Sequence, residues 1–154
     1  MNPLRERRRV ALQVLYQLDN GGLPDDVDSL RLAIQESVDT SNTDDETIGE
    51  GITLAKDAWT HRATADTAIG ALTPEWPIRR QPVIDRNLLR LAWYEMTQAG
   101  TPPKVVISEA VDLAREYSTD QSPSFVNGVL DRLFQDLRDN TTATPDQVAP
   151  DASS

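Results

Sequence analysis

The chain has 154 residues, 38% of them hydrophobic, and a formal net charge of −10 at pH 7. The absence of cysteine excludes disulfides and thiol nucleophiles, and a single histidine argues against zinc sites and a Ser-His-Asp triad. No apolar run is long enough for a membrane span and no signal-peptide core is present, so we expect a cytoplasmic protein with no catalytic residues, metal or cofactor.

Residues 5–20 have the apolar spacing of a helix, which should end at the glycine pair beginning with Gly21. Another side of this expected helix is basic: residues 1–18 carry four arginines and one glutamate, a charge of +3 that leaves −13 for the rest. A row of arginines beside a tyrosine can hold a phosphate backbone while the ring stacks on a base. A solvated helix start accounts for the same pattern equally well. The candidate RNA contacts on this side are Arg5, Arg8, Arg9, Gln13 and Tyr16.

The segment 19–50 contains ten acidic residues and one basic residue, which predicts a poor surface for RNA. Its aspartates lack the glycine and terminal glutamate of a calcium-binding loop, so a solvated acidic face is the better interpretation. Leu30 and Ile34 have the spacing of a short amphipathic helix. Thr43 with Glu46 three positions later predicts a capping box for the next helix.

Apolar residues at helical spacing run from Ile48 to Leu72 and predict one long helix that contains His61. With no partner ligand nearby in the sequence, this histidine is expected to be a surface or packing residue. A further helix follows, for which Asp85 is the expected N-cap. That helix is apolar on most sides around Leu91, so we expect it to be central or to contact a partner.

Residues 101–137 form the best-specified stretch and predict two helices joined by a polar turn. Thr101 is the expected cap of the first helix, and Ser122 begins the second. Gly128 lies inside the second helix against propensity, and close approach of a neighbouring helix is the preferred explanation. Lys104, near the start of the first helix, is a further candidate RNA contact.

Phe125 does not fit the buried stripe of the second helix, because it lies roughly a hundred degrees round from the apolar residue that follows it. An aromatic in the first turn of a helix can stack on a base, with Ser122, Ser124 and Asn127 supplying hydrogen bonds. A ring folded back onto the core is the alternative that composition alone favours.

The acidic tail, residues 139–154, has low hydrophobicity and two prolines, and is expected to be disordered. No strand-like alternation competes with the helical patterns. We therefore predict that residues 1–138 form one all-α domain of about seven helices.

Three segments taken together resemble the NusB family of bacterial transcription antitermination factors. These are RRRVALQVLYQLD near the start, VIDRNLLRLAWYEM in the middle, and PPKVVISEAVDLAREYS followed by SFVNGVLDRL. They occur in the family's order and cover most of the chain. The last is the most specific, because it has matching residues on both faces of two helices.

This resemblance implies a fold of two packed three-helix bundles. It also implies a non-enzymatic role in binding the boxA element of ribosomal RNA leader transcripts. The implied partner is NusE, a ribosomal small-subunit protein, and the heterodimer is expected to join RNA polymerase with other Nus factors.

The positions that match the family's RNA contacts are Arg5, Arg8, Tyr16, Gln121, Ser122 and Phe125. Asp85 and Arg86 begin the helix that lies near the NusE surface, and are the expected partner contacts. Gln121 stands where some relatives have an acidic residue, which removes a charge that would repel phosphate. Pro103 stands where an aromatic can occur.

Two other functions fit the same sequence. One is a homodimeric helical adaptor, in which the arginine face of one copy pairs with the acidic segment of another. The other is a stand-alone RNA-binding domain like that of ribosomal RNA cytosine methyltransferases, although this chain lacks the cysteine nucleophile of those enzymes. The free oligomeric state is left open.

Overall fold

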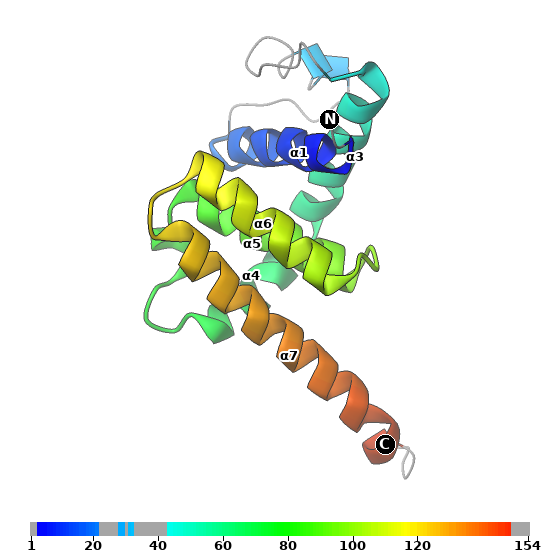
Figure 1. Cartoon of the computed structure of the whole chain (residues 1–154), viewed down its shortest axis with the longest axis vertical. Helices are drawn as coiled ribbons and strands as arrows, with labels where there is room; N and C mark the ends of the chain where they lie inside the picture. The colour runs from blue at the N-terminus through cyan, green and yellow to red at the C-terminus, as the bar shows by residue number, and fades with distance from the viewer. Residues whose placement is uncertain (1–2, 22–27, 30, 33–42, 149–154) are drawn as a thin grey trace.

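The computed structural model describes residues 3–21, 28–29, 31–32 and 43–148. In these residues the regular structure is all helical, which confirms the all-α prediction (Figure 1). The elements are α1 (Pro3–Asp19), α3 (Asp45–Thr60), α4 (Arg62–Leu72), the 3₁₀ turn η1 (Ile78–Arg80), α5 (Val83–Thr97), α6 (Pro103–Tyr117) and α7 (Ser122–Val148). The short helix expected around Leu30 and Ile34 lies largely outside the described residues. None of the helices in the described part is long and apolar enough to cross a membrane.

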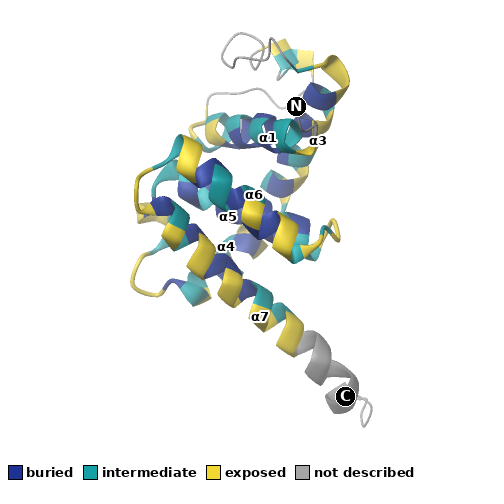
Figure 2. Cartoon of the chain, in the orientation of Figure 1, coloured by how far each residue is buried: buried dark blue, intermediate teal, exposed yellow. Residues whose placement is uncertain are grey.

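Helix α5 is the central element, as its apolar sides predict. It contacts α1, α3, α4, α6 and α7, and it buries Leu88, Leu89, Leu91, Ala92 and Trp93. Burial of a large apolar side chain contributes about 1.5–3 kcal/mol, so a helix buried on several sides is where the most stabilisation is concentrated. Figure 2 shows the buried residues gathered where α5 and α6 pack together, and exposed residues along the outer side of α7.

Two apolar clusters form the core, and α5 contributes to both. One cluster joins α1 and α3 and includes the buried Leu91 of α5, with the partly buried Tyr94 packed against it. The other joins α4, α5, α6 and α7, with Leu12 of α1. In the described residues the clusters group α1 with α3, and α4 with α5, α6 and α7. The packing of two three-helix bundles stays a prediction, because most of the segment between α1 and α3 lies outside the described residues.

Helices α1 and α3 approach each other closely at Gly51. A Cβ atom on this glycine would lie 2.7 Å from Cβ of Val10 and 2.8 Å from the carbonyl oxygen of Arg7. Only glycine allows this backbone approach. Gly128 of α7 is different, since a Cβ there would meet nothing within 4 Å. The close-approach explanation for Gly128 is therefore wrong, and the position faces open space.

The long helix predicted from Ile48 to Leu72 is divided in two at His61. That residue ends α3 and precedes α4, with φ −94° and ψ 9°. Its ring lies 6.4 Å from the ring of Trp93 and 5.4 Å from that of Tyr94, measured between centroids. His61 is thus the packing residue that the sequence suggests. The division lets the chain change direction and cover α5 with two short helices.

Three expected helix caps are also replaced by other residues. Asp44, not Thr43, caps α3, and its Oδ1 accepts a hydrogen bond from the Thr47 amide at 2.7 Å. Pro82 precedes α5 and Pro102 precedes α6, so neither Asp85 nor Thr101 is the cap. A proline fixes φ near the helical value and needs no amide partner, which allows it to start a helix without a side-chain cap.

Helix α7 is longer than predicted. The sequence suggests an end near Leu137, whereas the helical backbone continues to Val148. Disorder of the tail stays a prediction. A helix that packing has already nucleated extends at little further cost, so its end need not coincide with the last buried residue. Residues 149–154 lie outside the described part.

Candidate nucleic-acid interface

The N-terminal arginine row is largely neutralised by carboxylates of the same chain. Arg5 donates from Nε to Oε1 of Glu109 at 3.0 Å and from its terminal nitrogen to Oδ2 of Asp112 at 2.7 Å. The hydrogen bond from Arg5 lowers the pKa of Glu109 below its usual range. Arg9 is paired with Glu6 of its own helix at 2.7 Å. A phosphate must therefore compete with carboxylates for these two guanidiniums.

Arg8 is a buried structural residue. Its side chain and that of Glu95 are each only 3% exposed, and Arg8 Nε lies 3.0 and 2.9 Å from the two carboxylate oxygens. The prediction that Arg8 shares an exposed face with Arg5 is wrong. Residues three apart on a helix diverge by about 60°, which here takes one side chain to solvent and the other under α5. RNA contact by Arg8 stays a prediction, and it would require the buried pair to open.

The other candidates on α1 are partly accessible. The Tyr16 residue is 39% exposed and Gln13 is half-buried. Tyr16 lies near the C-terminal end of α1, about 16 Å along the helix axis from Arg5. These two candidates therefore cannot contact the same nucleotide.

The end of α1 is fastened to the start of α5 by Asp19. Its Oδ2 accepts hydrogen bonds from Arg86 at 2.7 Å, Asn87 at 3.0 Å and Arg90 at 3.2 Å. Burial acts to raise the pKa of Asp19, but these donors and the positive charges of Arg90 and Arg86 outweigh it and lower the pKa. Arg86, an expected partner contact, is thus half-buried and ion-paired.

Asp85 fastens the start of α5 to the α6–α7 turn. It is 1% exposed, and its two carboxylate oxygens accept hydrogen bonds from Ser118 and Ser122. Ser122 is itself buried and also bonded to Ser118 and Thr119. Neither Asp85 nor Ser122 presents a free polar group at the surface. Contact of Asp85 or Arg86 with a partner stays a prediction.

Through Asp19 and Asp85 the first turn of α5 holds the end of α1 beside the start of α7. We call this region the α5-start end, defined by Tyr16, Asp19, Asp85, Gln121 and Phe125. Here two groups of predicted RNA contacts, far apart in sequence, are fastened to the same turn. Arg5 and Lys104 lie elsewhere, at the starts of α1 and α6.

The predicted α7 residues surround its first two turns. Gln121, Ser124 and Asn127 are exposed. Lys104 is exposed too, and lines a hollow between α6 and α7 together with Asn127. Exposed amide, hydroxyl and ammonium groups can all donate to RNA oxygens.

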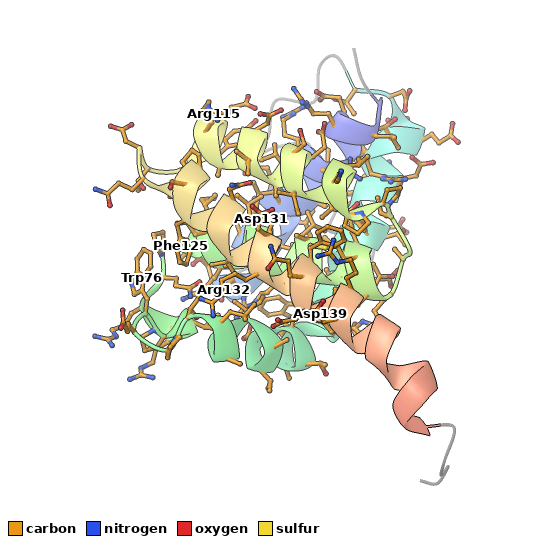
Figure 3. The ribbon with its side chains drawn as sticks, turned by 60° about the horizontal axis from the view of Figure 1, so that its bottom comes forward. Trp76, Arg115, Phe125, Asp131, Arg132 and Asp139 are labelled. Carbon is orange, nitrogen blue, oxygen red and sulfur yellow. The ribbon has the colours of Figure 1, made fainter. Side chains whose placement is uncertain are left out.

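Phe125 fits in part the interpretation as a core residue and in part the interpretation as a stacking residue. It is half-buried against the larger core cluster, and its ring packs edge-to-face on Trp76 with centroids 4.7 Å apart. Trp76 lies in the α4–α5 connection and is 38% exposed. Figure 3 shows the two labelled residues next to each other between this connection and α7, with Arg132 nearby. The two rings form an aromatic pair at the α5-start end.

The α4–α5 connection also carries Arg79 and Arg80, both exposed, in η1. Within the described residues neither guanidinium has an ion-pair partner. The sequence prediction treats this connection only as the end of a helix and misses Trp76, Arg79 and Arg80. The available signal was WPIRR, an aromatic residue and two arginines placed between prolines.

This arrangement provides exposed aromatic surface, hydrogen-bond donors and cations. In the described residues no cluster of acidic or histidine side chains could hold a metal ion. Such a site can bind a ligand that carries phosphates and stacking rings, which is the chemistry of a single-stranded nucleic acid.

Comparison with known proteins gives a consistent result. The model of the NusB family matches residues 5–135. A transcription antitermination protein NusB from Streptomyces griseus is 42% identical over 137 residues, which cover 86% of this chain and 92% of the relative. One from Solibacter usitatus is 38% identical over 135 residues, covering 86% and 89%.

Solved structures agree with this result. T. maritima NusB is 29% identical with a TM-score of 0.70, covering 86% of this chain and 89% of that chain. A crystal structure of the antitermination factors NusB and NusE in complex with dsRNA contains a chain that is 26% identical with a TM-score of 0.73, covering 88% and 98%. The chain therefore belongs to the NusB family of transcription antitermination proteins, which are not enzymes.

Proposed function

We propose that this protein binds single-stranded boxA RNA of ribosomal RNA leader transcripts as a heterodimer with NusE, and that the complex promotes antitermination by RNA polymerase with other Nus factors. Family membership supports the antitermination role, and the structural neighbour in complex with NusE and dsRNA supports NusE and RNA as partners. The relatives described above are antitermination proteins over most of their length, which favours this role over the methyltransferase alternative.

The observation that carries the proposal is the α5-start end. Asp19 and Asp85 fasten the exposed Tyr16 of α1 and the first turns of α7 to one turn of α5. Two stacking residues, Tyr16 and Phe125, with the polar side chains of Gln121 and Ser124 then belong to one rigid end of the domain. A preorganised surface loses less conformational entropy when RNA binds.

NusE matters in this proposal because the protein is acidic. A net charge of −10 repels RNA at long range, and several N-terminal arginines are engaged by carboxylates. A partner that adds contacts to the same RNA raises the overall affinity without any change in this chain.

Fluorescence anisotropy with end-labelled boxA RNA and a scrambled RNA of equal length tests the proposal, with and without NusE. We expect tighter binding of boxA than of the scrambled RNA, and a gain in affinity when NusE is added. Equal affinity for boxA with and without NusE would show the cooperative part to be wrong. Equal affinity for the two RNAs would refute boxA recognition.

Size-exclusion chromatography at low and high salt tests the homodimer alternative. A monomeric RNA adaptor keeps one elution volume until RNA or NusE is added. Self-association through the arginine and acidic faces would weaken as salt rises, because charge interactions are screened.

A further inference from the structure

The α4–α5 connection carries a second aromatic–basic element that the resemblance does not assign. Of the three tryptophans, Trp76 is the exposed one, because Trp93 is buried and Trp59 is half-buried. An exposed tryptophan on a packed domain leaves a large apolar ring in water, which is unfavourable unless the ring contacts something else.

Trp76 is held in place rather than free to move. The buried side chain of Gln81 donates from Nε2 to the carbonyl oxygen of Trp76 at 3.0 Å and lies 3.4 Å from the Thr73 hydroxyl. The Trp76 amide donates to the carbonyl of Thr73 at 3.1 Å. On the other side the Trp76 ring packs on Phe125. The connection is thus a fixed turn that presents one ring to solvent.

The Trp76–Phe125 pair separates two open hollows. One, of about 560 Å³, is lined by the end of α4 and by α7, including Gly128 and Arg132. The other, of about 580 Å³, is lined by the α6–α7 turn, including Gln121. Both volumes fall within the range of small-molecule sites, so each hollow can accept a planar ring. The missing side chain at Gly128 keeps the first hollow open beside the tryptophan.

The arginines near Trp76 favour an anionic ligand for this surface. Arg79 and Arg80 follow Trp76 closely in the chain and have no ion-pair partner among the described residues, unlike Arg5. The Arg132 guanidinium lies at the rim of the first hollow, and among the described residues it donates only to the Leu72 carbonyl, at 3.4 Å. Two arginines that follow a fixed aromatic ring in the chain, with a third at the rim of the hollow beside that ring, can hold phosphates while the ring stacks on a base.

We propose that Trp76 stacks on a base of the bound RNA and that Arg79 and Arg80 contact its phosphates, so that the strand runs from the α7 turns onto the α4–α5 connection. This inference rests on the proposed RNA-binding function and extends its surface. Glu75 also lines the first hollow. Its charge opposes a phosphate there, and the strand is expected to follow the arginines instead.

The test uses the full chain with NusE and end-labelled boxA RNA. Trp76→Ala should weaken binding by roughly 5- to 150-fold, the range for one lost stacked base. Trp76→Tyr should stay near wild type, because tyrosine also stacks. The double variant Arg79→Ala, Arg80→Ala should flatten the plot of log affinity against log salt by about 1.4, about 0.7 for each lost phosphate contact on a single strand. Arg138→Ala, which removes one positive charge from the distal part of α7, is the control and should leave the salt dependence unchanged.

Intrinsic fluorescence gives a direct signal from the ring. RNA that stacks on Trp76 should quench the wild-type emission, and the quenching should be absent in Trp76→Tyr, where only Trp59 and Trp93 remain. Glu75→Gln should tighten binding by removing the opposing charge. Thermal unfolding of each variant identifies any that fail to fold. If Trp76→Ala does not fold, the loss of quenching in Trp76→Tyr and the salt dependence of the double arginine variant decide whether RNA contacts this surface.

The outcomes separate this inference from the function on which it rests. If the wild type does not bind boxA RNA, the proposed function fails and the inference fails with it. If the wild type binds RNA, and folded Trp76→Ala and the double arginine variant bind it equally well, only the inference is overturned. Variants that keep RNA binding but lose NusE would show that this surface contacts protein, which also overturns it.

Discussion

Replacement of Arg8 by alanine is expected to lower the stability of the fold severely while leaving the exposed surface almost unchanged. The Arg8–Glu95 pair joins α1 to α5, and both side chains are 3% exposed. Arg8 donates from Nε to the carboxylate at 3.0 and 2.9 Å and from a terminal nitrogen at 2.9 Å. Without Arg8, the Glu95 carboxylate would remain buried beside an apolar residue with no cation.

The expected magnitude follows from this burial. Removal of one partner of a buried ion pair costs about 3–5 kcal/mol, because the remaining charge is neither solvated nor compensated. For a chain of this size each kcal/mol corresponds to a shift of about 2–4 °C in Tm, so Arg8→Ala should melt roughly 6–20 °C below wild type. The double variant Arg8→Met, Glu95→Leu should recover much of this loss, since it leaves no buried charge.

Urea denaturation followed by circular dichroism measures both variants and their coupling in a double-mutant cycle. Anisotropy titrations with RNA, carried out well below the melting temperature, should show wild-type affinity for folded Arg8→Ala. If Arg8→Ala unfolds within about 0.5 kcal/mol of wild type and instead weakens RNA binding with a flatter salt dependence, Arg8 is a surface phosphate contact. That result would refute a structural role for the Arg8–Glu95 pair.

Two glycines provide a matched comparison: Gly51→Ala should destabilise by about 1–3 kcal/mol through overpacking, whereas Gly128→Ala should stabilise by up to about 1 kcal/mol through helix propensity. Urea midpoints measure both, and equal effects would contradict the difference in space around them. Acidification should lower the Tm of the wild type, because the ion pair with Arg5 depresses the pKa of Glu109 in the folded state. The pair stabilises the fold above pH 4.5, the ordinary pKa of a glutamate, and its contribution is lost as the pH falls through the folded-state pKa. Arg5→Ala should reduce this dependence, and an identical pH profile would show that the pair contributes nothing. Asp85→Ala should cost about 1–3 kcal/mol, since two serine hydroxyls lose their acceptor; a loss of NusE binding without any loss of stability would instead indicate a direct partner contact.

Much of the fold follows from local spacing. The apolar period predicts that α1, α5, α6 and α7 are helices, and the apolar sides of α5 predict its central place, because a helix can hide such a surface only by packing on several neighbours. The break at His61 was not predictable in the same way. Apolar residues continue through it at helical spacing, and only the need to turn around α5 divides the helix.

The candidate site also has features that the sequence predicts and features that it does not. The exposure of Tyr16 agrees with its position on α1, and that of Gln121 with its place in the polar turn before α7. The family motifs identify the antitermination family from sequence alone. The partners of the polar residues could not be predicted in this way, because they are distant along the chain. Glu95 lies 87 residues after Arg8, and Ser122 lies 37 residues after Asp85.

The sequence by itself thus determined the helical class, the central helix and the family, since each depends on residues close together in the chain. Only the tertiary structure decided which arginines are neutralised and which are free. Arg8 is buried and paired whereas Arg79 is exposed and unpaired among the described residues, although both are arginines in basic runs. The physical reason is that an ion pair forms where packed helices bring opposite charges together, and the spacing along one helix does not specify the face of another that meets it.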